Sequence, residues 1–240
     1  MFSTSSQKSS SLIVSTTSCA IVRVCSSPCF AQSLHEFRAV VVERASLQRV
    51  NLFNKIDIIV GVIDSGIWLE SESFNDEGFG PIPAKWKGVC DGGEGFVCNR
   101  KIIGARTFSL QSYNKFSARD TSGHGTHVAS IISGREVIDA SYYGIAKGIA
   151  RGGVPSTRIA AYKVCYHINC FDIDVLSAFD HAIADGVDII SVSIARPRLV
   201  ELTFDPIAIG AFHAMEKGIL TVNAAGNDGP LLSSIKNYAP

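Results

Sequence analysis

The sequence predicts a three-layer α/β fold in which helices cover both faces of a mostly parallel sheet. Three observations support this fold class. Apolar runs of strand length recur from about residue 55 onward, the later runs alternate with helical patterns of about 12 residues, and Gly or Pro separates them. Because strands that alternate with helices form right-handed βαβ units, the sheet should be parallel and covered on both faces.

The predicted core strands are continuous apolar runs: 56–64, 158–165, 187–194 and 219–227. The first of them, IDIIVGVID, ends in an acid and has the unbroken apolar character of a buried parallel strand. Residues 65–118 are rich in Gly, Pro, Asn and Ser, so we expect a long surface excursion there, with short strands such as 100–108.

The predicted helices carry recognisable start and stop signals: 125–134 ends at Gly134, 173–186 has Asp172 as N-cap and Gly186 at its end, and 206–218 has Pro206 in its first turn and Gly218 beyond its end. The helix 173–186 also has apolar residues at helical spacing. Each helix is long enough to cover neighbouring strands, so these signals agree with the predicted fold class.

Composition excludes several function classes. Lys+Arg and Asp+Glu balance at 22 each, so no basic surplus points to a nucleic-acid partner. No run reaches the roughly 18 apolar residues that a membrane span requires. A nucleotide-binding α/β domain would need a G-x-G-x-x-G turn after the first strand, and the sequence there, IDSGIWLES, lacks it. We therefore expect no nucleic-acid, membrane or cofactor partner, and the oligomeric state stays open.

The first 50 residues differ from the rest and are expected to be an atypical leader or a propeptide relic without ordered structure. Residues 1–35 contain eleven serines and no Asp or Glu. Their apolar stretch breaks at Arg23, whereas a secretory signal needs an uninterrupted apolar core. The second unit, 51–240, has globular composition.

The seven cysteines include two close pairs within the globular part, Cys90 with Cys98 and Cys165 with Cys170. Spacing alone is compatible with two disulfide-closed loops in an oxidising compartment or with reduced thiols. No C-x-x-C pattern is present, so a structural zinc site is not expected.

Candidate catalytic residues fall where strands end or helices begin. Asp64 ends the first strand, Asn227 ends the last, and His124 opens a helix. Ligands and catalytic groups collect at the carboxyl ends of parallel strands. An Asp that holds a His in the right tautomer lets the imidazole deprotonate a hydroxyl nucleophile, and an Asn amide can stabilise the resulting oxyanion.

Each candidate also has a structural alternative. Asp64 can be a turn residue or helix cap, and Asn227 lies in an Asn-Asp-Gly sequence that is common in turns. His127, one helical turn after His124, is better explained as a packed structural residue. The H-x-x-H pair lacks the Glu of H-E-x-x-H, so we expect no metal site.

Three motifs together resemble those of the subtilisin-like serine proteases: VIDSG at 62–66, GHGTHVA at 123–129 and NAAGNDGP at 223–230. The similarity is greatest to the plant, cucumisin-like branch and covers about residues 55–240. The resemblance implies a serine endopeptidase acting on proteins or peptides, with Asp64 as orienting acid, His124 as general base and Asn227 as oxyanion donor. It also implies secretion to the extracellular space or cell wall, no cofactor, and the disulfides Cys90–Cys98 and Cys165–Cys170.

The sequence departs from the family pattern at the nucleophile. The family serine lies in a G-T-S-M-A motif, which these 240 residues do not contain, and Ser122 cannot substitute for it. We expect the chain to be the N-terminal part of the domain and inactive in peptide hydrolysis, with an uncovered sheet edge. The alternative function is a non-catalytic pseudoenzyme or peptide-binding remnant. Residues 36–50 are the only candidate propeptide relic.

A second departure concerns the substrate-binding strand. By resemblance, Ser193, Ile194 and Ala195 pair with the substrate backbone. Family members usually have two glycines here, whereas this sequence has Ala195 and Arg196. The added side chains predict a narrowed or altered cleft.

Overall fold

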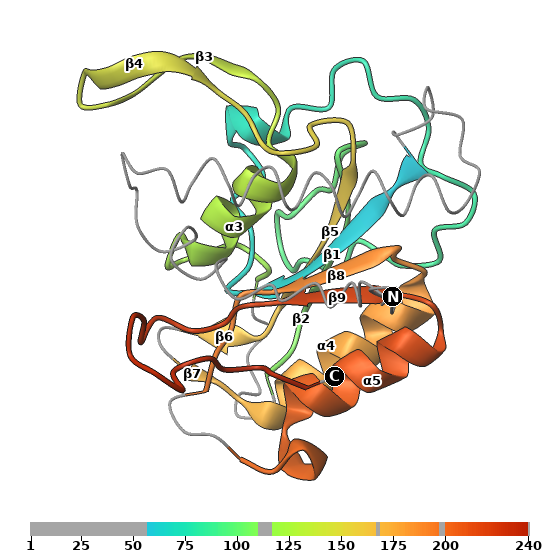
Figure 1. The fold of residues 1–240 in the computed structure, drawn as a ribbon. Coiled ribbons are helices and arrows are strands. Elements are labelled where there is room, and N and C mark those ends of the chain that lie inside the picture. The colour runs from blue at the N-terminus through green and yellow to red at the C-terminus, as the bar shows by residue number, and fades with distance from the viewer. Residues whose placement is uncertain (1–56, 110–116, 167–168, 197–199, 240) are drawn as a thin grey trace, which may run out of the picture.

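A five-stranded parallel sheet forms the centre of the computed structural model, which describes residues 57–109, 117–166, 169–196 and 200–239 (Figure 1). The strand order is β2-β5-β1-β8-β9. Its members are β1 (Ile59–Asp64), β2 (Ile102–Thr107), β5 (Arg158–Lys163), β8 (Ile189–Val192) and β9 (Leu220–Asn223). All four strand pairs are parallel, as predicted. The predicted leader, residues 1–50, lies outside the described residues.

Helices cover both faces of this sheet. α3 (His124–Ser133) lies on one face, and α4 (Asp172–Asp185) and α5 (Pro206–Glu216) lie on the other (Figure 1). The side chains of β1 alternate accordingly: Val60 and Val62 belong to the apolar cluster on the α3 side, and Ile59 and Ile63 to the cluster on the α4 side. The three-layer prediction is therefore confirmed.

The helix boundaries agree closely with their sequence signals, with one correction. Gly186 ends α4 in the left-handed conformation at φ 85°, and Pro206 opens α5. Asp172, however, is the first residue of α4, and its N-cap position belongs to Phe171. The Asp172 carboxylate pairs with Arg196.

The short strand predicted at 100–108 is present as β2, but residues 65–118 are only partly a surface excursion, because this strand belongs to the central sheet. β2 pairs with β5, and Ile102 and Ile103 are fully buried against opposite faces of the sheet. The remaining elements are short: η2 (Glu72–Phe74), β3 (Val137–Tyr142), β4 (Ile145–Ala150), β6 (Cys165–Tyr166), β7 (Asn169–Cys170) and η3 (Leu202–Phe204). The β3–β4 hairpin was not predicted. It projects from the body and is largely exposed, so it lacks the alternation of a half-buried strand (Figure 1).

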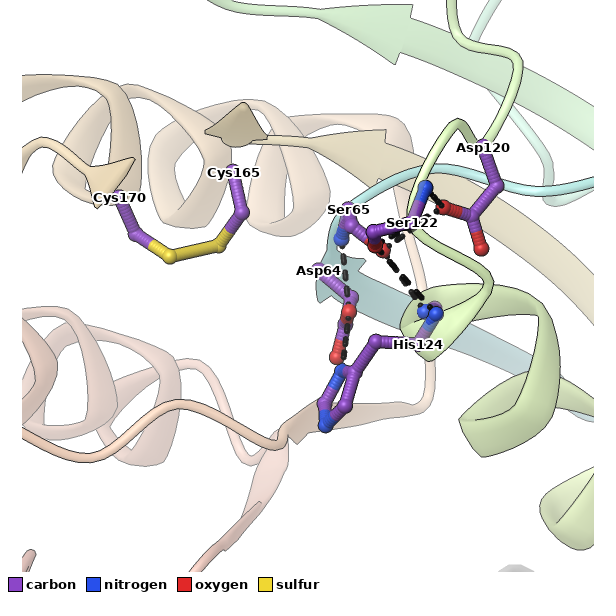
Figure 2. The surroundings of a disulfide bond; sticks show 8 residues. Asp64, Ser65, Asp120, Ser122, His124, Cys165 and Cys170 are labelled. Carbon is purple, nitrogen blue, oxygen red and sulfur yellow. Dashed lines mark hydrogen bonds and ion pairs between the residues drawn. A yellow bond between two sulfur atoms is a disulfide. The ribbon is translucent and has the colours of Figure 1, made fainter. Parts of the chain in front are cut away.

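Both close cysteine pairs form disulfides, one of the two alternatives that their spacing allowed. Cys90 bonds to Cys98, and Cys165 bonds to Cys170 across the short β6–β7 pair just before α4 (Figure 2). Both pairings agree with those implied by the family resemblance. Among the described residues, no helix combines the length and the apolar character that crossing a bilayer would need.

Lys101 directly precedes β2, and its side chain is fully buried and reaches the end of α3. Its Nζ donates to Ser133 Oγ at 2.6 Å and to the carbonyl oxygens of Pro155 and Thr157 at 2.8 and 2.7 Å. Burial, with smaller contributions from the charges of Arg135 and Arg158, lowers the pKa of Lys101 to about 6.

This burial predicts a pH dependence of stability. The unfolded chain binds a proton at Lys101 that the folded chain lacks, so the free energy of unfolding should rise as pH increases from about 6 toward 9. Lys101→Met should flatten that rise, because methionine does not titrate. Urea unfolding at several pH values measures both curves, and parallel curves for the two proteins would contradict the prediction.

Candidate active site

Asp64 and His124 form a hydrogen-bonded pair at the carboxyl end of β1 and the first residue of α3. His124 Nδ1 lies 2.7 Å from Asp64 Oδ1 (Figure 2). The Asp64 side chain is 2 % exposed, and that of His124 is 38 % exposed. A buried carboxylate therefore holds one ring nitrogen, and the other can face a substrate. This is the arrangement in which an imidazole acts as a general base toward a hydroxyl.

The carboxylate favours the charged form of the imidazole. The hydrogen bond that His124 donates to Asp64 raises the pKa of His124, against the opposing effect of burial, and the negative charges of Asp64 and Asp120 add to the rise. Ser65 N also donates to Asp64 Oδ1, at 2.7 Å. Within the described part of the chain, Asp64 Oδ2 is buried without a hydrogen-bond partner.

The start of α3 is held by three side chains from two places in the sequence, the residue after β1 and the loop before the helix. Its N-cap residue, Gly123, is in the left-handed conformation at φ 86° and offers no side-chain cap. The helix N–H groups are satisfied instead by other residues. His124 N donates to Ser122 Oγ, Gly125 N to Ser65 Oγ and Thr126 N to Asp120 Oδ2.

Asp120 and Ser65 are site residues that the sequence reading missed. Asp120 accepts hydrogen bonds from Ser65, Ser122, Gly123 and Thr126. Burial opposes ionisation, but these hydrogen bonds outweigh it and lower the pKa of Asp120. The signal was present: an Asp followed by Thr-Ser-Gly just before a helix is typical of side-chain capping.

Asn227 and the predicted substrate-binding residues lie at the same edge of the sheet as Asp64, beyond the ends of β9 and β8. β9 ends at Asn223, so Asn227 lies in the bend beyond the strand and not at its end, and it is exposed. Ser193, Ile194 and Ala195 follow the end of β8, which lies between β1 and β9. Because parallel strands present their carboxyl ends at one edge, these segments and Asp64 share that edge.

Hydrogen bonds and an ion pair fix the segments that follow β8 and β9 at this edge. Asn237 Nδ2 donates to the carbonyl oxygens of Ile194 at 2.8 Å and Ala224 at 2.7 Å, joining the segments after β8 and β9. Arg196 donates through its NH2 group to the Asp172 carboxylate at the start of α4. The guanidinium expected to occupy the cleft is thus engaged in a surface ion pair.

His127 lies one turn along α3 from His124 and is half-buried. Burial lowers the pKa of His127, and the charge of His124 lowers it further. It lines a cavity of about 320 Å³ together with Trp68 and several hydroxyl side chains. Among the described residues, no group of three or more His, Cys, Asp or Glu side chains could hold a metal ion.

The chain is similar in sequence to one protein family and to plant proteases of that family. A sequence profile described as the Subtilase family matches residues 55–239. Subtilisin-like protease SBT4.3 of Arabidopsis thaliana is 61% identical over 186 residues, which are 77% of this chain and 25% of that protein. Subtilisin-like protease SBT4.4 of the same plant is 58% identical over 184 residues, with the same two shares. The chain therefore spans about a quarter of the length of these relatives.

Two solved structures also match part of the chain, at lower sequence identity. MycP1 with its N-terminal propeptide removed has a TM-score of 0.42 at 21% identity, covering 72% of this chain and 44% of that one. The self-cleaved protease domain of PatA has a TM-score of 0.45 at 18% identity, covering 72% and 50%.

Proposed function

The chain belongs to the subtilase family, whose profile matches most of its length, and on that premise we propose that it carries the acid and base of a serine endopeptidase site. Asp64 is the orienting acid, and His124 is the general base that takes the proton of a serine hydroxyl. Asn227 is the oxyanion donor. Ser193, Ile194 and Ala195 bind the substrate backbone by strand addition.

One observation carries this proposal: the 2.7 Å hydrogen bond between a buried Asp64 oxygen and Nδ1 of a partly exposed His124. A carboxylate in this position fixes the tautomer of the ring and stabilises the imidazolium that forms during the reaction. The exposed fraction of His124 leaves the ring accessible, as a general base toward an incoming nucleophile must be.

The nucleophile belongs to a G-T-S-M-A motif that these 240 residues do not contain. We propose that the acid–base half described here does not hydrolyse peptides by itself. The same pair in a chain without a nucleophile is the non-catalytic alternative, a peptide-binding remnant. The two disulfides support an oxidising compartment, so we propose export to the extracellular space or cell wall, with protein or peptide substrates.

A fluorophosphonate probe, which labels activated serines, tests this proposal. The 240-residue chain should remain unlabelled, and a serine adduct on it would overturn the assignment of the nucleophile. A chimera completed with the remaining catalytic domain of SBT4.3 should be labelled. His124→Ala should abolish that labelling, whereas His127→Ala, one turn along the same helix, should preserve it. Labelling that survives His124→Ala would refute the proposed role of His124.

A further inference from the structure

Asp120 makes more hydrogen bonds than a helix cap requires. Its Oδ1 accepts from Ser65 Oγ at 3.0 Å, from Gly123 N at 2.9 Å, and from both N and Oγ of Ser122 at 3.0 and 3.2 Å. Its Oδ2 accepts from N and Oγ1 of Thr126 at 2.9 and 2.6 Å. A capping side chain usually satisfies one or two backbone N–H groups at its own helix. Asp120 also reaches a residue of another element, Ser65.

Ser65 connects this carboxylate to Asp64 and to Gly125, the residue that follows His124. The residue is 4 % exposed and directly follows Asp64 (Figure 2). Its hydroxyl donates to Asp120 and accepts from Gly125 N at 2.8 Å, and its own N–H donates to Asp64 Oδ1. The path Asp120–Ser65 therefore joins the loop before α3, the first turn of α3 and the end of β1.

The contact between the first turn of α3 and the end of β1 is too close to admit an additional side-chain atom. A Cβ atom on Gly125 would lie 2.3 Å from the carbonyl oxygen of Gly66 and 3.2 Å from Asp64 Cβ. The first turn of α3 thus packs directly on the backbone that follows β1. His124 precedes Gly125, so a small displacement of this turn changes the distance between its ring and Asp64.

From these contacts we infer that Asp120 is a positioning residue for the catalytic pair, which acts through the Ser65 hydroxyl to hold His124 against Asp64. This inference rests on the proposed roles of His124 and Asp64. It gives the loop RDTSG, residues 119–123, a function beyond capping: it sets the geometry of the general base.

A competing explanation is that Asp120 acts only through its charge. Asp64 and Asp120 are the two acids whose charges raise the pKa of His124, and His127 is the neighbouring base. Loss of the Asp120 charge would lower the pKa of His124 without any change of geometry. Removal of the Ser65 hydroxyl separates the two explanations, because Ser65→Ala leaves both carboxylates in place.

The test is NMR titration of His124 in the 240-residue chain, together with detection of its Nδ1 proton. Asp120→Asn and Ser65→Ala should each lower the pKa of His124 by about 0.5 or more and weaken the downfield Nδ1 proton signal, because a displaced ring loses part of its hydrogen bond to Asp64. Asp205→Asn is the matched control. It removes a buried acid that caps α5 through Ile207 N, so it should lower stability and leave His124 unchanged.

Two results would overturn the inference. A shift in Asp120→Asn with none in Ser65→Ala would reduce the role of Asp120 to its charge. Unchanged titration in both folded variants would reduce it to an ordinary cap. Because the readout needs no nucleophile, a failed peptidase assay would count against the proposed function and leave this measurement intact.

Discussion

Asp64→Asn is expected to lower the pKa of His124 by about 1 to 3. An opposite charge within hydrogen-bond distance stabilises the imidazolium and raises its pKa by about that much. The carboxylate is almost fully buried and lies 2.7 Å from Nδ1, so solvent cannot replace its effect. NMR titration of His124 in the wild type and the variant measures the change directly. Asp76→Asn, which removes the surface partner of Arg100, is the control and should leave the titration of His124 unaltered.

The same substitution changes the pH dependence of stability. The folded-state pKa of His124 is raised, so the stabilisation from the pair is fully present below about 6.5, the ordinary pKa, and is lost as pH rises through the folded value. Asp64→Asn should remove this loss. In the chimera that carries a nucleophile, the variant should also lower turnover by about 10⁴-fold, as loss of a triad carboxylate typically does. An unchanged pKa with full turnover would contradict the assignment of Asp64.

Gly125→Ala should disrupt the site through packing alone. The new methyl group would lie 2.3 Å from the Gly66 carbonyl oxygen, a backbone atom that has no rotamer by which to move away. We expect α3 to be displaced from the end of β1, at a cost of about 3 kcal/mol in the free energy of unfolding. Urea unfolding measures that cost, and the Nδ1 proton signal of His124 reports the broken contact with Asp64.

Gly148→Ala provides the matched control for this prediction. Gly148 lies in the exposed hairpin strand β4, and a Cβ atom there would have no neighbour within 4 Å. Stability should therefore change little. If Gly125→Ala were as stable as Gly148→Ala and kept the Nδ1 signal, the close approach of α3 to the end of β1 would not be needed to hold His124 in place.

Local signals in the sequence were sufficient to predict the layers of the fold. The unbroken apolar character of β1 indicated a strand buried on both faces, and Pro206 and Gly186 marked a helix start and a helix end. Signals of this kind act within a few residues, so they can be read without knowledge of the partners. The exposed β3–β4 hairpin carries no such periodicity, and the pairing of β2 with β5 depends on contacts between segments about 55 residues apart.

The sequence by itself determined the α/β class, the positions of its helices and the candidate pair Asp64 and His124. Only the tertiary structure decided that these two side chains touch, since they are 60 positions apart. It also determined that Ser65 donates a hydrogen bond to Asp120 and that Arg196 binds Asp172. Patterns in a sequence record which faces are apolar and where the backbone turns. Hydrogen bonds between distant polar groups depend on the register and packing of several elements at once.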